Sequence, residues 1–251
     1  MWVHAMDVML AQLEAQLEAA GLALGSVAAV SASGQQHGSV YWADGAAGLL
    51  AELDPALLLH EQLANAFAVD ESPTWMDSST SLQCRQREQA VGGALALAKI
   101  SGSRAFERFT GNQIAALLAK PTGLRLDGIE RIGLVSSFVA SLLAGQYAGI
   151  DSSDAGGMNL MNIRTQKWSE RLLEITAPAQ PTTQKLQALL GQIVQPHSIV
   201  GLLHPYFSHR YGFSEACVVV ASSGDNPCSL AGLGLSKDGD VGISLGSSDT
   251  M

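Results

Sequence analysis

The stretch Val30-Ser31-Ala32-Ser33-Gly34-Gln35-Gln36-His37-Gly38-Ser39-Val40-Tyr41-Trp42 joins two apolar runs through a polar loop that two glycines bracket. Residues 27–30 and 39–42 are rich in strand formers, so the sequence predicts a strand, a loop and a second strand. Gly34 and Gly38 permit a tight backbone that approaches its neighbours closely. The amides and the imidazole between them offer several donors and acceptors, which suits a polyhydroxylated ligand. A polar hairpin tip without a ligand fits the same residues.

The composition favours a folded protein with a large core. The chain has 251 residues, of which 47% are hydrophobic and 15% are charged. Its net charge of −9 leaves no basic patch for phosphates, which argues against a nucleic-acid partner. A nucleotide ligand remains compatible with this net charge, because a few backbone amides and a metal ion are enough to bind it. The sequence contains no internal repeat and no linker, so we expect one α/β domain over residues 1–251.

The cysteines and the apolar runs bear on the compartment. Cys84, Cys217 and Cys228 are sparse and odd in number, which indicates reduced thiols and a cytoplasmic protein. No set of cysteines and histidines has the spacing of metal ligands, and we predict no metal-ligating residue. Acidic residues interrupt the first segment and no basic leader precedes it, which is unlike a signal peptide. The uncharged run 132–150 holds serines and glycines that favour a buried core helix, so we predict no membrane partner.

Periodicity predicts most of the helices. Apolar residues at helical spacing predict a first helix that begins at Trp2 and ends at Gly21. The pattern also predicts one continuous helix over residues 83–98, with Cys84, Val91 and Leu95 facing inward. Shorter helices are expected over 114–119, 168–175 and 185–194. The glycine-rich, acidic segment 151–162 is interpreted as a turn, with a pocket lining as the alternative, and 197–211 as irregular.

A second strand end carries the catalytic candidate. Residues 216–221 form an apolar strand followed by Ser222-Ser223-Gly224-Asp225-Asn226-Pro227. Chemistry in α/β folds gathers at the carboxyl ends of strands. Asn226 fits a helix N-cap and Pro227 the first helical position, so Asp225 would lie at the positive end of that helix. This field favours an ionised carboxylate, the state that a proton acceptor needs. Taken alone, Gly-Asp-Asn is a common turn.

Three motifs in the same chain order carry a resemblance to a known family. The Gln35-Gln36-His37 loop is similar to the sugar-binding loop of the FGGY carbohydrate kinases, in particular the eukaryotic-type xylulokinases. Residues 100–113 and Gly224-Asp225-Asn226 also resemble this family, and the resemblance covers nearly the whole chain. It implies a ribonuclease H-like domain of the actin-like ATPase superfamily, with a mixed sheet flanked by helices.

The resemblance also implies roles for individual residues. Asp225 would be the general base that takes the proton from the terminal hydroxyl of the sugar. The substrate-binding residues would be Gln36, His37, Asp77, Arg108, Asp225 and Asn226, and the phosphate-binding residues Gly246, Ser247 and Ser248. From the residues alone, Arg108 equally fits an ion pair with Glu107 or Glu88, and Asp77 equally fits a helix N-cap region. Arg104 and Arg108 are four apart, so we expect them on one side of a helical turn.

The implied activity is ATP-dependent phosphorylation of D-xylulose to D-xylulose 5-phosphate, with Mg²⁺. Residues 1–251 resemble part of the N-terminal domain, without its first β-hairpin and without the C-terminal nucleotide-binding domain. We therefore expect this chain alone to be inactive. The alternatives are a non-catalytic sugar-binding protein, a relic or interaction protein, or an FGGY kinase for another pentulose. The residues do not determine the oligomeric state.

Overall fold

The computed structural model describes residues 1–120 and 123–243. The helices are α1 (Trp2–Ala19), α2 (Ala46–Ala51), α3 (Leu59–Gln62), α4 (Ser81–Val91), α5 (Ala94–Ser101), α6 (Thr110–Ala119), α7 (Val135–Ala144), α8 (Ser152–Gly156), α9 (Glu170–Thr176), α10 (Gln180–Leu190), α11 (Pro205–Tyr211) and α12 (Asp225–Gly232), with the 3-10 turns η1 (Leu24–Ser26) and η2 (Leu126–Gly128). The strands are β1 (Ala29–Val30), β2 (Ser33–Gly34), β3 (Ser39–Ala43), β4 (Ile129–Leu134), β5 (Ile150–Asp151), β6 (Met161–Asn162), β7 (Lys167–Trp168), β8 (Ile193–Val194), β9 (Ile199–Leu202), β10 (Val218–Val220) and β11 (Ser223–Gly224). The predicted phosphate-binding residues Gly246, Ser247 and Ser248 lie outside the described residues.

The sheets consist of short strands, some paired in parallel and some antiparallel, which agrees with the predicted mixed sheet. β10 lies between β1 and β9, parallel to β1 and antiparallel to β9. β2 continues the chain beyond β1 and pairs in parallel with β11, while β3 pairs antiparallel with β4. The strands predicted at 27–30, 39–42 and 216–221 are confirmed as β1, β3 and β10. The mixed arrangement of strands flanked by helices is therefore the one that the sequence indicates.

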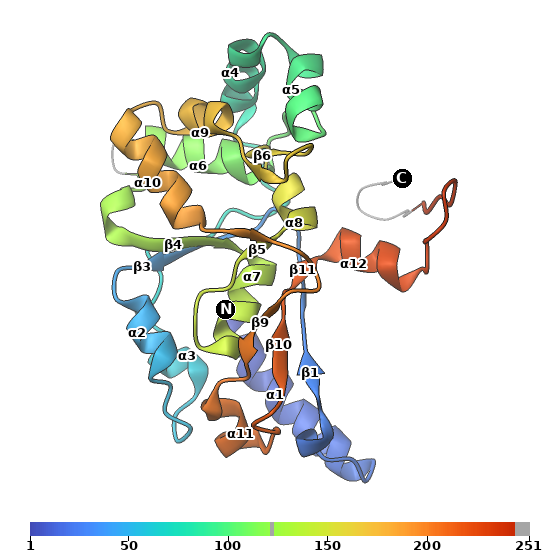
Figure 1. Ribbon diagram of the computed structural model, residues 1–251. Coiled ribbons are helices and arrows are strands. Elements are labelled where there is room, and N and C mark those ends of the chain that lie inside the picture. Colours follow the sequence, from blue (N-terminus) through green and yellow to red (C-terminus); the bar gives the residue numbers. More distant parts are fainter. Residues whose placement is uncertain (121–122, 244–251) are drawn as a thin grey trace.

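The pair β3–β4 separates two hydrophobic cores. Val40 and Trp42 of β3 belong to one core, which also includes parts of α1, α3, α7, α11 and β10. Tyr41, between them in the chain, belongs to the other, which includes parts of α6, α9, α10 and β4. Figure 1 shows the two groups of helices on opposite sides of this pair. Successive side chains of a strand point to opposite faces, so β3 reads as a continuous apolar run because both of its faces are covered.

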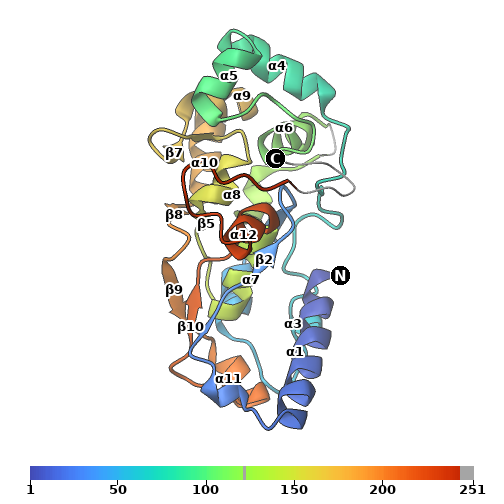
Figure 2. The same ribbon diagram turned by 90° about the vertical axis from the view of Figure 1, so that its right-hand side faces the viewer.

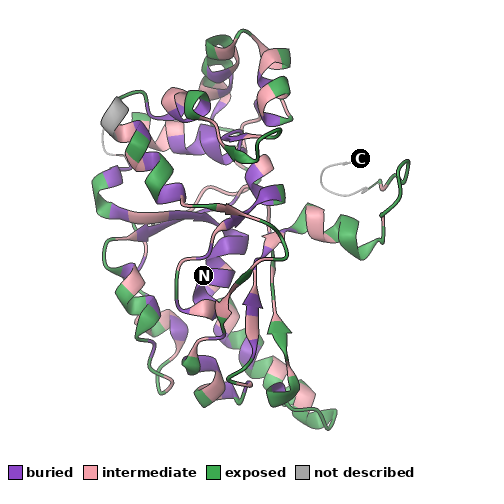
Figure 3. Ribbon diagram, in the orientation of Figure 1, coloured by how far each residue is buried: buried purple, intermediate pink, exposed green. Residues whose placement is uncertain are grey.

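Helix α7 lies in the middle of the molecule, directly after β4 (Figure 2). Eight of its residues are buried, and Figure 3 shows it as one of the most deeply covered helices: Val135, Ser136, Ser137, Phe138, Ala140, Ser141, Leu142 and Leu143. The prediction of a buried core helix within the run 132–150 is therefore confirmed. Among the described residues, no helix combines the length and the apolar character that crossing a membrane would require. The three cysteines are unpaired, as predicted.

The helix predicted over 83–98 is wrong, because two glycines break it. Gly92 and Gly93 both have positive φ (93° and 115°), so α4 ends before them and α5 begins after them. The break changes the rotational phase of the second segment. Leu95, predicted to face inward, is 71% exposed, whereas Leu97 is fully buried.

Three further segments differ from the predictions. Residues 151–162 contain helix α8 rather than only a turn, because the Asp151 side chain accepts a hydrogen bond from the Ser153 N–H at 2.7 Å and caps the helix. Residues 197–211 contain β9 and α11 instead of irregular structure. The helix expected over 185–194 stops at Leu190, since residues 193–194 form β8 beside β5. Helices α1, α6 and α9 confirm the remaining predictions within a few residues at their ends.

Strand β2 crosses the start of α7 at very close range. A Cβ atom on Gly34 would lie 2.5 Å from the Ser136 backbone N and 2.9 Å from its Cα. Both neighbours are backbone atoms of a buried helix, so neither can move aside alone. Glycine is therefore required here for packing.

We predict that Gly34→Ala destabilises the protein by about 2 kcal/mol or more, since the added methyl group overpacks a rigid contact. Gly48→Ala is the matched control, because Gly48 is an exposed position of helix α2 and its Cβ would meet nothing within 4 Å. That control should be neutral or should stabilise by up to about 1 kcal/mol through helix propensity. Urea denaturation followed by circular dichroism measures both changes. Equal stability of Gly34→Ala and wild type would contradict the packing argument.

Candidate active site

Two parallel strand pairs bring two distant loops to the same edge. Val30 pairs with Val219, and Gly34 pairs with Gly224. The segment from Val219 to Gly224 is therefore one residue longer than the segment from Val30 to Gly34. Serine hydroxyls bond across this irregular point. Ser31 Oγ donates to the carbonyl oxygen of Ala221 at 3.1 Å, and the Ala32 N–H donates to Ser222 Oγ at 3.0 Å. Because the strands run in the same direction, the loops that follow Gly34 and Gly224 leave them side by side.

Gln36, Asp225 and Asn226 are in direct contact at this edge. The Gln36 N–H donates to Asp225 Oδ1 at 3.2 Å, and the Asn226 N–H donates to the same oxygen at 2.9 Å. Asn226 Nδ2 donates to Gln36 Oε1 at 2.8 Å. A Cβ atom on Gly224 would lie 2.6 Å from Gln36 Cγ, so this close approach needs glycine. The structure thus joins three of the residues that the sequence analysis proposed for one site.

Helix α12 begins two residues earlier than predicted. Asp225 is its first residue and Gly224 occupies the N-cap position, so the assignment of Asn226 as N-cap and Pro227 as first residue is wrong. The reason is that the Asn226 side chain bonds to Gln36 across the strands instead of capping its own helix. Asp225 nevertheless lies at the amino end of the helix, as expected.

His37 lies beside this contact in a strained backbone conformation. Its φ of 67° is in the left-handed region, and its ring packs on Phe109 with 4.8 Å between ring centroids. A Cβ atom on Gly157 would lie 3.2 Å from His37 Cε1, so the imidazole rests against a glycine. Burial lowers the pKa of His37 to about 4, aided by the charge of Arg108 and opposed by a hydrogen bond with the Gly157 backbone and by Asp225. The imidazole is therefore neutral near pH 7, and both Arg108 and Asp225 are close enough to act on it.

Arg108 lies in a turn between α5 and α6, whereas Arg104 lies in irregular structure, so the prediction that one helical turn holds both arginines is wrong. Helix α5 ends at Gly102, whose φ is 86°, and α6 starts only at Thr110. The two guanidinium groups instead flank the ring of Phe106, at 5.8 Å for Arg104 and 5.3 Å for Arg108.

The ion pairs distinguish the two arginines. Glu88 pairs with Arg104 at 3.5 Å, and Glu107 accepts a hydrogen bond from Ser81 Oγ at 2.9 Å. Within the described residues, Arg108 has no carboxylate oxygen within 4.0 Å. Its charge therefore remains available to a ligand beside His37.

Asp77 lies apart from these residues. Its Oδ1 accepts hydrogen bonds from the N–H and the hydroxyl of Ser79, both at 2.7 Å, just before α4. It lines a surface pocket together with Gln113 and Lys120, and the lining of that pocket includes none of Gln36, His37, Arg108 and Asp225. Of the two expectations for Asp77, this geometry favours the structural one at the helix start.

A buried carboxyl group that the sequence analysis missed lies beside Asp225. Asp154 of α8 accepts a hydrogen bond from Ser136 Oγ at 2.5 Å. Burial raises the pKa of Asp154 to about 7, opposed by the Ser136 hydroxyl and reinforced by the charges of Asp151 and Asp225. Asp151 Oδ2 is also buried and has no hydrogen-bond partner among the described residues. The spacing Asp151-x-x-Asp154 resembles a capped helix start, and it is the signal that could have indicated α8.

Known proteins resemble this chain in sequence and in fold. Residues 64–232 match the family model described as the FGGY family of carbohydrate kinases, N-terminal domain. The chain is 53% identical to xylulose kinase 2 of Arabidopsis thaliana and 50% identical to xylulose kinase of Rattus norvegicus, over 251 residues in each case. All of this chain is covered, but only 43% and 45% of those proteins, so the chain spans less than half their length.

A crystal structure of xylulose kinase from Bifidobacterium adolescentis superposes with a TM-score of 0.68 at 20% identity. The match covers 93% of this chain and 48% of that one. At this identity the likeness shows the fold, which is the actin-like ATPase fold of sugar kinases that the sequence predicts. The family model covers well over half of the residues. The chain therefore belongs to the FGGY family of carbohydrate kinases.

Proposed function

We propose that the protein binds D-xylulose between the Gln36–His37 loop and the Asp225–Asn226 turn, and that this site serves ATP-dependent phosphorylation to D-xylulose 5-phosphate. The observation that carries the proposal is the direct contact between the two loops, with Arg108 and His37 beside it. The names of relatives with 50% identity or more support this ketose over another pentulose.

The proposed site suits a small polyol. The neutral imidazole of His37 and the amides of Gln36 and Asn226 both donate and accept hydrogen bonds, as sugar hydroxyls do. The Arg108 guanidinium has no described carboxylate partner, and its planar fork can donate two bonds to neighbouring sugar oxygens. Phe106 holds this guanidinium in place through its ring face.

Asp225 is proposed to be the general base. Both hydrogen bonds that the described residues give to its carboxylate end on Oδ1, which leaves Oδ2 to accept a proton. Oδ2 takes the proton of the terminal sugar hydroxyl as that oxygen bonds to the γ-phosphorus of ATP. The bond from this phosphorus to the bridging oxygen breaks, and ADP leaves. In such reactions positioning and charge neutralisation supply most of the acceleration.

The described residues fit the Mg²⁺ ion that the family implies. Asp154 and Asp225 supply the carboxylate oxygens that Mg²⁺ prefers, and the charge of Asp225 adds to the effect of burial that raises the pKa of Asp154. When bound there, the ion would neutralise charge on the phosphate oxygens. Gly246, Ser247 and Ser248 are proposed to contact phosphate through their backbone amides.

The domain organisation and the location belong to the same proposal. Residues 1–251 would correspond to part of the N-terminal domain, and the matched model describes that domain. Three unpaired thiols support a cytoplasmic location.

Removal of the Arg108 guanidinium should weaken sugar binding. We expect Arg108→Ala to raise the Kd for D-xylulose about tenfold or more, since hydrogen bonds from a charged donor are lost. Arg104→Ala is the matched control, because Arg104 flanks the same ring but pairs with Glu88, and it should change Kd less than about twofold. Isothermal titration of the purified chain measures both, and D-ribulose in place of D-xylulose tests the alternative pentulose. Equal effects of the two substitutions would argue against the site.

The role of Asp225 is tested by an isosteric substitution. Asp225→Asn keeps an oxygen for the two N–H donors but removes the proton acceptor. It should lower kcat for phosphate transfer to D-xylulose by about 10²–10⁴-fold, measured with a longer protein that contains this chain. Sugar affinity should change only a few-fold. Asp238→Asn, at an exposed position, is the control and should leave kcat unchanged. A variant Asp225→Asn with wild-type kcat would exclude this residue as the base.

The neutral state of His37 predicts a pH dependence of stability. The native state keeps this imidazole neutral down to a pH of about 4, whereas the unfolded chain takes up a proton near the ordinary pKa of 6.5. Above pH 6.5 the free energy of unfolding is therefore not reduced by His37. Below that pH it falls by about 1.4 kcal/mol per pH unit as the pH drops toward 4. We expect His37→Asn, which tolerates the left-handed φ, to flatten the free energy of unfolding in this window.

Urea denaturation at a series of pH values provides the measurement. Arg108→Gln is a second variant, because it removes a charge that helps to lower the His37 pKa. It should move the lower end of the window to higher pH. Parallel curves for wild type and His37→Asn would show that His37 does not titrate differently on folding.

A further inference from the structure

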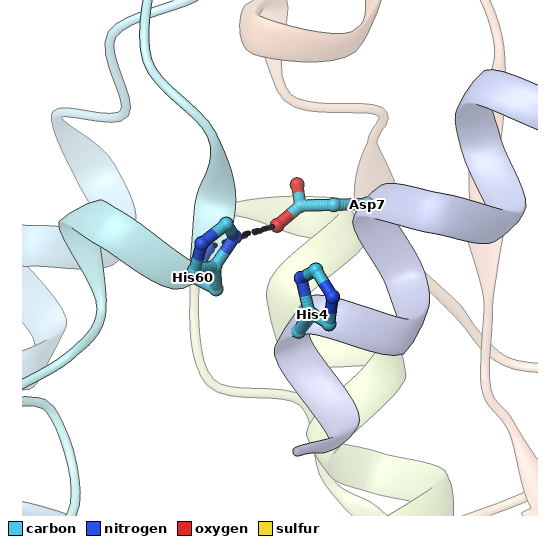
Figure 4. A group of neighbouring side chains, drawn as sticks. All are labelled: His4, Asp7 and His60. Atoms are coloured by element: carbon cyan, nitrogen blue, oxygen red, sulfur yellow. Dashed lines mark hydrogen bonds and ion pairs between the residues drawn. The ribbon is translucent and has the colours of Figure 1, made fainter.

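We propose that His4, Asp7 and His60 form a binding site for a divalent transition-metal ion. One ligand atom of each residue lies within 4.8 Å of those of the other two (Figure 4). His4 and Asp7 are three residues apart on α1, which places them on one face of that helix. His60 lies in the first turn of α3, which packs against α1. None of these residues takes part in the proposed sugar site.

The donor set points to the class of ion. Two imidazole nitrogens and one carboxylate oxygen are ligands that suit Zn²⁺, Co²⁺ or Fe²⁺, whereas Mg²⁺ and Ca²⁺ prefer oxygen alone. Zn²⁺ sites with three protein ligands complete their coordination with water. His4 is exposed and His60 partly so, which leaves the open side of the group accessible to solvent.

Asp7 is held in place for such a role. Its side chain is only 4% exposed, and its two oxygens accept backbone N–H groups of Leu59 at 2.9 Å and of His60 at 3.0 Å. Bonds of this kind orient the carboxylate of a metal ligand. His60 Nδ1 lies 2.8 Å from Asp7 Oδ2, and the His4 ring stands edge-on to the His60 ring with 4.7 Å between centroids. Both imidazoles therefore already face the carboxylate.

Only a small movement would complete the geometry. Metal–ligand bonds of about 2.0–2.2 Å place two ligands of one tetrahedral ion about 3.3–3.6 Å apart. The widest separation of 4.8 Å must close by about 1 Å. The exposed His4 side chain can do so by rotation. In the absence of an ion, a proton on His60 Nδ1 bonds to Asp7. When Nδ1 binds the metal, that proton moves to Nε2 and the ring stays neutral.

Bound metal would fasten the first helix to α3. A ligand that binds only the native state stabilises it by an amount that rises with the logarithm of the free ligand concentration above Kd. The hydrogen bonds of Asp7 join the same two helices, so the ion would add to an existing contact.

The test uses the purified chain after chelator treatment, titrated with Zn²⁺ and, for spectroscopy, with Co²⁺. We expect one equivalent to bind and the thermal midpoint to rise with it. The Co²⁺ complex should show visible d–d bands without the near-ultraviolet band of a thiolate ligand. His4→Ala and His60→Ala should each weaken binding at least about tenfold. His197→Ala, at an exposed position in the connection between β8 and β9, is the matched control and should bind as wild type does.

A second variant guards against misfolding. Asp7→Asn retains an oxygen for the Leu59 N–H and removes the anionic ligand, so it should fold, as judged by circular dichroism, and lose metal affinity. Absence of binding to the wild type would overturn the proposal. So would full affinity in His60→Ala, or a thiolate band from Co²⁺, since the latter would place the ion on a cysteine.

Discussion

The parallel alignment of β2 with β11 is the constraint on which the candidate site depends. Gln36 and Asp225 are far apart in the chain and come from loops that share no sequence signal of contact. They meet because Ser33 and Gly34 lie opposite Ser223 and Gly224, and both strands end at the same level. Parallel strands cannot be joined by a tight turn, so the intervening chain is free to build both cores around them.

Burial shifts the pKa values of His37 and Asp154, which lie beside this alignment, in opposite directions. It lowers the pKa of His37 and raises that of Asp154, and in both cases the neutral form gains. Near pH 7 the imidazole of His37 is neutral and about half of the Asp154 carboxyl groups are protonated, so these two buried groups add less charge to the site than exposed groups would. The Asp225 side chain itself is exposed to solvent.

The sequence predicts the elements whose signals are local. The strand ends before Gln35 and Asp225 and the core run around α7 could be recognised because apolar runs and glycines mark them. The sequence does not reveal the helix break at Gly92, because the helical pattern of apolar residues continues past it. It does not reveal α8 either, because the glycines of that segment favour a turn and hide the capping role of Asp151. His60 meets Asp7 only through the packing of α3 on α1, which no pattern within either segment reveals.

Helix α12 gives the carboxylate of Asp225 an unusual mechanical setting. None of the residues of α12 is buried, although strand β10, shortly before it in the chain, includes the fully buried Val219. The helix leaves the body of the molecule at Asp225 (Figure 1). It extends about 12 Å from Asp225, the residue that we propose as the base. A contact made near Gly232 would therefore act on the orientation of that carboxylate from outside the proposed site.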